Sequence, residues 1–291
     1  VRIEGIVKSR SINRNYKKSK YDLIWMVDSD IIINKEAIYG ILARFQTNPK
    51  LVAANCAYKM RNKGWFARMQ QMECSMMSFI LMSHNAFSTL YLWGGCLAIK
   101  KAAFEKVRGY SENMLTEDAD LAFKLKEQDM YVEHSMIPVS CICVDNFKGW
   151  CKQKSRWISG TVQCYIKHVK VWIRHPLHII FLLLFSVLSI IFIILLLRSI
   201  FFLNTVWKTY FLLRETTSRL LSLKAMGWYY GLGLIKYLTS KFYFAAFSAP
   251  YTVPMMKNFK EAYKILYIFP FAFIYFPALS ILALISVGRG I

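Results

Sequence analysis

The spacing of apolar positions divides the chain into two parts. Up to about residue 176, apolar runs are short and are separated by charged and polar residues, as in a folded domain. Beyond that point the runs lengthen: 23 uncharged residues separate Arg174 from Arg198, and 24 separate Lys264 from Arg289. Because about 20 apolar residues cross a bilayer, the second part predicts membrane-spanning helices.

The second part is expected to form an α-helical transmembrane bundle over residues 177–291. The middle of this part contains Lys236 and Lys241, so that segment either crosses the membrane with both lysines facing a polar interior or lies at the interface. We place three spans, near residues 177–197, 226–249 and 265–287. A re-entrant segment or an additional short span around Ile200 to Leu213 stays open, because it would remove the conflict between the basic loop that follows the first span and the positive-inside tendency.

The segment between the two parts has its own pattern. From Trp157 to Arg174, apolar residues recur close to the helical period, with basic residues between them. A helix of this kind either lies on the membrane surface or packs on the soluble domain. The predicted organisation is therefore a first domain over residues 1–150, an amphipathic interface helix over 151–176 and the transmembrane region over 177–291.

The charge balance agrees with a membrane-associated protein. The chain has 38 Lys and Arg against 17 Asp and Glu, a net charge of +21 and a pI of about 9.7. A mean hydropathy of +0.31 and 56% hydrophobic residues exclude a disordered tail and argue against a simple soluble domain. The basic residues are scattered rather than grouped with stacking aromatics, so anionic lipid explains them and no nucleic-acid partner is expected.

The first candidate site residues follow a predicted strand. The run from Tyr21 to Val27 is short and apolar, and Asp28 and Asp30 come directly after it. Open α/β sheets bind ligands beyond the carboxyl ends of their strands, where two carboxylates can hold Mg²⁺ or Mn²⁺ against a nucleotide diphosphate. Asp at a strand end is also an ordinary turn residue, so this motif alone leaves both interpretations open.

A second acidic group lies at the start of a predicted helix. Glu117, Asp118 and Asp120 follow Thr116 and precede an apolar run. They can cap the helix, because the helix dipole stabilises negative charge at that end. Alternatively, one of them is a general base that takes a proton from a hydroxyl as the hydroxyl attacks an activated sugar.

The third group is Gln153, Arg156 and Trp157, at the start of the amphipathic segment. An Arg side chain can hold a diphosphate through paired hydrogen bonds, and a Trp ring offers an apolar face on which a pyranose stacks. An interfacial Arg and Trp would explain the motif equally well in isolation. Its position between the acidic groups and the first span gives it weight.

The order of these three motifs, with a membrane span directly after them, resembles the processive family 2 glycosyltransferases, the group of cellulose, chitin, poly-N-acetylglucosamine and hyaluronan synthases. The segment from Lys8 to Asn13 looks like that family's Lys-x-x-Ala-Leu-Asn segment, and Trp93 to Gly95 looks like its acceptor-side turn. The resemblance implies that residues 1–150 form part of a cytosolic α/β domain of the GT-A type, a Rossmann-like nucleotide-diphospho-sugar transferase fold.

The resemblance also implies roles for individual residues. Asp118 is expected to be the catalytic base, and Asp28 and Asp30 to hold the metal ion, Mg²⁺ or Mn²⁺. The implied reaction is an inverting transfer from a UDP-sugar to a growing polysaccharide acceptor, and it yields a β-linked polymer that is extruded through the membrane. The residues expected to bind substrate are Lys8, Gly94, Gly95, Gln153, Arg156 and Trp157.

The donor implied by the resemblance is UDP-N-acetylglucosamine, alone or with UDP-glucuronate, or UDP-glucose. The implied location is the plasma membrane, as a multi-pass protein in contact with the lipid bilayer; accessory subunits stay open. The Thr116-Glu117-Asp118 form is closer to the cellulose and poly-N-acetylglucosamine branches than to the Gly-Asp-Asp form of vertebrate hyaluronan synthases. No strand precedes the basic segment that follows Val1, which indicates an N-terminally incomplete chain.

Two other functions stay open from the sequence. A non-processive enzyme that moves one sugar to a lipid carrier would keep the Asp-x-Asp motif, but it would not need Gln-x-x-Arg-Trp. A non-enzymatic transporter or membrane scaffold with a basic cytosolic domain fits the net charge of +21 but does not require the order of the motifs.

Overall fold

The computed structural model describes residues 4–89, 91–176 and 274–287, together with single positions between 194 and 231. The chain divides into two compact units, residues 1–180 with 282–291 and residues 181–281. Among the helices described, none has the length and apolar character that crossing a membrane requires. The predicted spans near 177–197 and 226–249, and much of the span near 265–287, lie outside the described residues.

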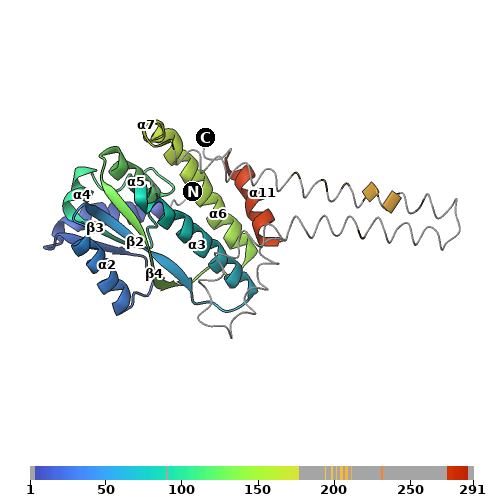
Figure 1. The fold of residues 1–291 in the computed structure, drawn as a ribbon, viewed down its shortest axis with the longest axis horizontal. Helices are drawn as coiled ribbons and strands as arrows, with labels where there is room; N and C mark the ends of the chain where they lie inside the picture. Colours follow the sequence, from blue (N-terminus) through green and yellow to red (C-terminus); the bar gives the residue numbers. More distant parts are fainter. Residues whose placement is uncertain are drawn as a thin grey trace. The chain divides into compact units, whose positions relative to one another are not determined.

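The first unit contains a mixed sheet of four strands, in the order β1-β3-β2-β4. Figure 1 labels β2, β3 and β4 of this sheet. Strand β3 runs antiparallel to both β1 and β2, whereas β2 and β4 are parallel. The carboxyl ends of β1, β2 and β4 therefore lie at the edge where β3 begins. The strand bounds are β1 Leu23–Val27, β2 Leu51–Met60, β3 Cys96–Lys100 and β4 Tyr131–Cys141.

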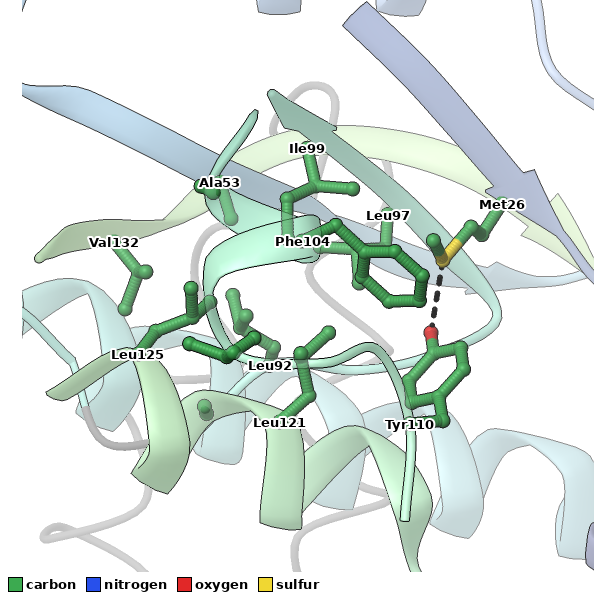
Figure 2. Packing of buried hydrophobic residues seen from close by; sticks show 13 residues of the cluster. Met26, Ala53, Leu92, Leu97, Ile99, Phe104, Tyr110, Leu121, Leu125 and Val132 are labelled. Carbon is green, nitrogen blue, oxygen red and sulfur yellow. Dashed lines mark hydrogen bonds between the residues drawn. The ribbon is translucent and has the colours of Figure 1, made fainter. Parts of the chain in front are cut away.

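One face of the sheet is covered by α4 (Lys101–Lys106) and α5 (Glu117–Glu127). Figure 2 shows Phe104 and Leu121 packed with strand residues, and the Tyr110 hydroxyl donates to the sulfur of Met26 at 3.0 Å. Burying a large apolar side chain of this kind stabilises the fold by about 1.5–3 kcal/mol. This cluster holds the amino end of α5, and with it Asp118, over the sheet.

The opposite face is covered by α2 (Lys35–Thr47), through Ala37 and Ile41. Successive strand residues point to opposite faces, so Leu97 of β3 enters the first cluster and Ala98 enters the second. Because both faces are buried, the strand reads as a continuous apolar run rather than an alternating one. The α/β domain that the sequence predicted is confirmed, with a mixed sheet covered by helices on both faces.

The remaining helices of this unit position the site. Helix α3 (Trp65–Ser83) leads directly into the short 3-10 helix η2 (His84–Phe87). The chain opens on α1 (Glu4–Asn15), which is followed by η1 (Tyr16–Lys18).

The interface helix predicted over 151–176 appears as α6 (Phe147–Lys167) and α7 (Val169–Arg174). Helix α6 begins earlier than predicted because the Asn146 side chain caps it, accepting a hydrogen bond from the Gly149 N–H at 2.8 Å. One face of α6, including Trp150 and Lys154, is buried, so this helix packs on the rest of the first unit. Its predicted place at the membrane surface stays a prediction.

Candidate active site

The site lies at the sheet edge where β1 ends and β3 begins. Asp28 directly follows β1, and its backbone N–H donates to the carbonyl of Gly95 at 2.9 Å. Gly95 in turn directly precedes β3, whose first residue Cys96 pairs with Val27. The antiparallel pairing of the two strands therefore places Asp28 beside the Gly94–Gly95 turn.

The Gly94–Gly95 turn must be made of glycine because two side chains press against it. A Cβ atom on Gly94 would lie 2.8 Å from the Cβ of Asp118, and one on Gly95 would lie 2.5 Å from the hydroxyl of Tyr58. The same two side chains satisfy the turn's backbone N–H groups. Gly94 donates to Asp118 Oδ2 at 2.7 Å, and Gly95 donates to the Tyr58 hydroxyl at 2.9 Å.

Asp118 lies in the first turn of α5, as the sequence predicted for the acidic group. Its second oxygen, Oδ1, accepts from the N–H of Ala119 at 2.9 Å. Burial, and next the negative charge of Glu117, raise the pKa of Asp118, while the Gly94 and Ala119 N–H groups and the Lys8 ammonium oppose the rise. A fixed carboxylate with an increased affinity for a proton is what a general base requires.

Lys8 of α1 connects the residues that follow β1 with those that begin α5. Its ammonium lies 2.7 Å from Asp28 Oδ1 and 3.2 Å from Glu117 Oε1, and it approaches the carbonyl of Gly94 at 3.5 Å. Burial lowers the pKa of Lys8, but Glu117 and Asp28 outweigh that effect, so the pKa is raised above its ordinary value. The site therefore holds one permanent positive charge among three carboxylates, a net negative environment that would favour a divalent cation, while the Lys8 ammonium offers a partner for phosphate oxygens.

Helix α6 attaches to the segment just before Asp118. The guanidinium of Arg156 donates to the carbonyl of Leu115 at 2.9 Å, and the side chain of Gln163 accepts from the N–H of Leu115 at 3.4 Å. Gly160 lies against Thr116, since a Cβ atom there would come within 2.5 Å of the Thr116 hydroxyl. Arg156 is otherwise exposed, so it can bind a ligand beside the amino end of α5.

The structure brings five of the sequence-predicted site residues into one hydrogen-bonded group: Lys8, Asp28, Gly94, Gly95 and Asp118. Arg156 reaches this group through Leu115. In the part of the chain that the structure describes, the hydrogen bonds and ion pairs of the group do not extend to Asp30, Gln153 or Trp157.

Those three residues lie on neighbouring elements. Asp30 is exposed. Burial of the Cys141 thiol, at the end of β4, and next the negative charge of Asp30 raise the pKa of Cys141 to about 12. Gln153 and Trp157 are half-buried on α6, and the ammonium of Lys154 lies 4.2 Å from the centre of the Trp157 ring.

Sequence reasoning missed two members of the group. Glu117 was noticed but given no role, although it is buried and pairs with Lys8. Tyr58 was not singled out at all. Its only signal was a polar aromatic residue near the end of an apolar strand, which is common in strands of any function.

The residues after β1 fit a hard divalent cation. Asp28 and Asp30 offer only oxygen atoms, and Mg²⁺ is commonly held by one or two carboxylates together with substrate phosphates. Over residues 4–89, 91–176 and 274–287, no group of three or more His, Cys, Asp or Glu gathers in a way that could hold a metal ion. The protein would thus contribute two carboxylates, and the diphosphate and water would complete the shell.

Comparison with known proteins gives a family match over most of the chain. The model of the family described as "Glycosyl transferase family group 2" matches residues 23–286. Poly-beta-1,6-N-acetyl-D-glucosamine synthases of Staphylococcus aureus and Staphylococcus epidermidis are 26% identical to this chain over 157 residues. Each match covers 53% of this chain and 38% of the relative, so the chain spans less than half the length of these curated relatives.

A solved structure also resembles part of the chain. It is a mannosyltransferase from Pyrobaculum calidifontis in complex with GDP-Man and Mn²⁺, with 14% sequence identity and a TM-score of 0.44. The likeness covers 56% of this chain and 43% of that one.

Proposed function

The chain belongs to glycosyltransferase family 2, and we propose that it is a membrane-bound, inverting and processive enzyme that builds a β-linked polysaccharide from a UDP-sugar. The observation that carries this proposal is the support of Asp118. Its carboxylate is fixed by the N–H groups of Gly94 and Ala119, and it lies beside the Lys8–Asp28 ion pair. A base and a binding place for a diphosphate therefore adjoin each other, as a single displacement requires.

In this proposal Asp118 takes the proton from the acceptor hydroxyl. The hydroxyl oxygen attacks the anomeric carbon of the donor from the face opposite the departing UDP, so the configuration of that carbon inverts. A carboxylate has about four lone-pair sites, and the two N–H donors occupy two of them. The remaining sites are available to accept the proton.

The departing diphosphate is held by cationic and amide side chains. Lys8 lies next to Asp28, and Arg156 of α6 lies beside the amino end of α5; Gln153, one helical turn earlier on α6, is proposed to assist Arg156. Asp28 and Asp30 would hold a divalent ion, Mg²⁺ or Mn²⁺, which neutralises phosphate charge when bound. Lys8 pairs with two carboxylates in the site and can pair with phosphate oxygens instead when the donor enters.

The acceptor end of the polymer is proposed to stack on Trp157. The ring is half-buried on α6, and a flat aromatic face suits the apolar face of a pyranose. The Gly94–Gly95 turn lies between Asp118 and Asp28, and its lack of side chains lets Asp118 and Tyr58 lie directly against its backbone.

The donor we propose is UDP-N-acetylglucosamine, because relatives named for a polymer of N-acetylglucosamine match the chain. We also propose that residues 177–291 anchor the protein in the plasma membrane with the catalytic domain on the cytosolic side. The long uncharged runs after Arg174 support this location. A metal ion, the growing chain and the bilayer are then the partners.

The test uses the full-length protein in membranes, with UDP-N-acetylglucosamine, UDP-glucose and UDP-glucuronate supplied singly and in pairs with Mg²⁺ or Mn²⁺. We expect polymer and UDP from UDP-N-acetylglucosamine. Asp118→Asn should reduce the rate by about 10²–10⁴-fold, because general-base catalysis typically contributes that factor. Asp22→Asn, the same change at an exposed aspartate, is the matched control and should keep full activity.

Three results would count against the proposal. Full activity of Asp118→Asn would remove the base from the mechanism. Transfer of one sugar only, to a lipid carrier, would show the non-processive alternative. Polymer from UDP-glucose alone would change the donor but leave the mechanism in place.

A further inference from the structure

The proposed reaction leaves unused an ion pair buried beneath the Gln153 to Trp157 motif. The Lys154 ammonium lies 2.7 Å from Glu73 Oε1, and the two side chains are only 4% and 9% exposed. Glu73 comes from α3, where it is the only acid among mainly apolar and sulfur-containing residues. Burying two charges costs several kcal/mol, so a pair like this is weak evidence for stability and invites another explanation.

The same ammonium touches the aromatic residue of the motif. Its Nζ lies 4.2 Å from the centre of the Trp157 ring, within the distance at which a cation is attracted to an indole face. Lys154 and Trp157 are three positions apart on α6, so their side chains are neighbours on one side of the helix. The attraction is stronger here than at an exposed site because Lys154 is shielded from water.

These contacts form a chain of support from α3 to Trp157. Glu73 fixes the position of the ammonium, and the ammonium covers one face of the indole. The ring stays half-buried, with part of its surface accessible. An aromatic ring that is held on one face offers the other face in a single orientation, which lowers the entropy lost when a sugar stacks on it.

We infer that Glu73 and Lys154 are positioning residues that hold the Trp157 ring in the orientation in which it stacks on the acceptor sugar. The inference rests on the proposed function, because it takes the acceptor role of Trp157 from there. It assigns a function to α3 in addition to its packing against β2 and β4. It also explains why a costly buried pair lies directly beside the motif.

The test measures the acceptor KM of full-length protein, using N-acetylglucosamine oligomers as the acceptor and a saturating donor. Lys154→Met and Glu73→Gln should each raise the acceptor KM about tenfold, equivalent to about 1.4 kcal/mol, with the donor KM unchanged. Lys154→Arg should keep the wild-type value, because a guanidinium also binds an indole face. Lys152→Met, the same change at an exposed lysine of α6, should have no effect.

A double-mutant cycle separates positioning from a purely structural role. In a Trp157→Ala background, Glu73→Gln should cause no further rise in acceptor KM, since both changes act through the same ring. The combined Glu73→Gln and Lys154→Met variant removes both buried charges, so it should fold while keeping the raised KM. Its thermal midpoint monitors folding.

Two outcomes would overturn the inference. If Trp157→Ala raises the acceptor KM and Glu73→Gln raises it further by the same factor, the pair acts independently of the ring. If Trp157→Ala raises it and the charge variants do not, the pair has no positioning role. An unchanged KM in Trp157→Ala itself would remove the acceptor role of Trp157 from the proposed function as well, while polymer synthesis would still stand.

Discussion

Among single residues, Gly94 is the one at which an added methyl group has the most direct consequence. A Cβ atom there would lie 2.8 Å from the Cβ and 2.9 Å from Oδ2 of Asp118, so the carboxylate must move. Gly94→Ala should therefore lower kcat by about 100-fold, since small displacements of a catalytic group cost that much. Gly40→Ala is the control, because the new methyl would meet only the flexible side chain of Ile137.

Steady-state kinetics with both variants tests this expectation. The donor KM of Gly94→Ala should change little, because Lys8 and Asp28 are untouched. A kcat equal to that of Gly40→Ala would mean that Asp118 accommodates the methyl group and that the turn is not needed in its observed form.

Lys8 is the residue at which charge has the largest effect. Lys8→Met removes the cation from between Asp28 and Glu117, so the donor KM should rise about tenfold through loss of a charge-assisted phosphate contact. Because the Lys8 charge lowers the pKa of Asp118, its loss should also move the acidic limb of the pH–rate profile to higher pH. Lys18→Met, at an exposed lysine, serves as the control.

The shift of the acidic limb is read from kcat measured at saturating donor between pH 5 and 8. A limb that moves to lower pH, or an unchanged donor KM, would contradict the assigned role of Lys8.

Tyr58 is a site residue that no sequence pattern indicated. Tyr58→Phe keeps the ring that packs on Trp93 at 4.7 Å but leaves the Gly95 N–H without its acceptor. Loss of one partner of a buried hydrogen bond costs about 1–3 kcal/mol, and we expect that loss in the free energy of unfolding together with a lower kcat. Urea unfolding and the transfer assay measure the two effects. An unchanged kcat would limit Tyr58 to a role in folding.

Site residues that stand in a recognisable local motif could be predicted from the sequence. Residues that the fold brings to the site from distant positions could not. Asp28 and Asp118 were predicted because carboxylates at a strand end and a helix start have known uses. Tyr58 and Glu73 lie 37 and 81 positions from Gly95 and Lys154 respectively, and no local pattern relates them. Only the sheet and helix packing brings them together.

At the scale of elements, α5 and the α6–α7 junction are joined by a buried ionic group. Asp120 accepts from Lys167 at 2.6 Å and lies 2.9 Å from His168, whose other ring nitrogen lies 2.8 Å from Glu127. Burial raises the pKa of Asp120, but the bonds to His168 and Lys167 outweigh this and lower it to about 2. Burial lowers the pKa of His168, but Asp120 and Glu127 outweigh this and raise it above 6.5.

These shifts predict how stability depends on pH. The contribution of His168 is fully present below pH 6.5, its ordinary pKa, and is lost as the pH rises through the raised folded value. The contribution of Asp120 to folding stability is present above pH 3.8, its ordinary pKa, and is lost as the pH falls through about 2. His168→Gln should therefore destabilise the protein by about 2 kcal/mol at pH 6, and the difference from wild type should shrink at higher pH.

Thermal unfolding of the wild type and His168→Gln at several pH values tests this prediction. His84→Gln, at a half-buried histidine of η2, is the matched substitution and should not show the same pH dependence. A constant difference between wild type and His168→Gln from pH 5 to 9 would mean that His168 stabilises only through packing.

Within the described part of the first unit, the strand predicted between Tyr21 and Val27 was found as β1, and the helix predicted after Thr116 was found as α5. The arrangement of these elements could not be predicted from periodicity. The start of α6 was misplaced because Asn146, a cap outside the periodic pattern, sets it. The insertion of β3 between β1 and β2 depends on pairing between strands distant in sequence, which a local pattern does not encode.

At the scale of the whole molecule, the first unit includes residues from the end of the chain. The Ser159 hydroxyl donates to the carbonyl of Ser286 at 2.9 Å, and the Ser286 hydroxyl donates to Ser155 at 2.9 Å. Ser286 lies in α11 (Phe276–Val287), 127 positions from Ser159. The helix that carries Arg156 and Trp157 is therefore tied to the C-terminal segment as well as to α5.

This tie predicts that Ser159→Ala lowers stability even though the residue is far from Asp118 in sequence. Leaving the Ser286 carbonyl without a donor costs about 1 kcal/mol, which lowers the thermal midpoint by about 2–4 °C in a protein of this size. Ser11→Ala, at an exposed serine of α1, should leave the midpoint unchanged. Equal midpoints for the two variants in scanning calorimetry would show that the bond contributes nothing.

Because main-chain N–H groups hold Asp118, the structure limits which substitutions positions 94 and 119 can accept during evolution. No single codon change at position 94 or 119 can delete an N–H group except a change to proline, so the support of the carboxylate survives nearly every replacement that the local space tolerates. Position 119 can therefore change among small residues during evolution, whereas the lack of space beside Asp118 restricts position 94 to glycine. Lineages that diverge in sequence around this turn would keep the same orientation of the carboxylate.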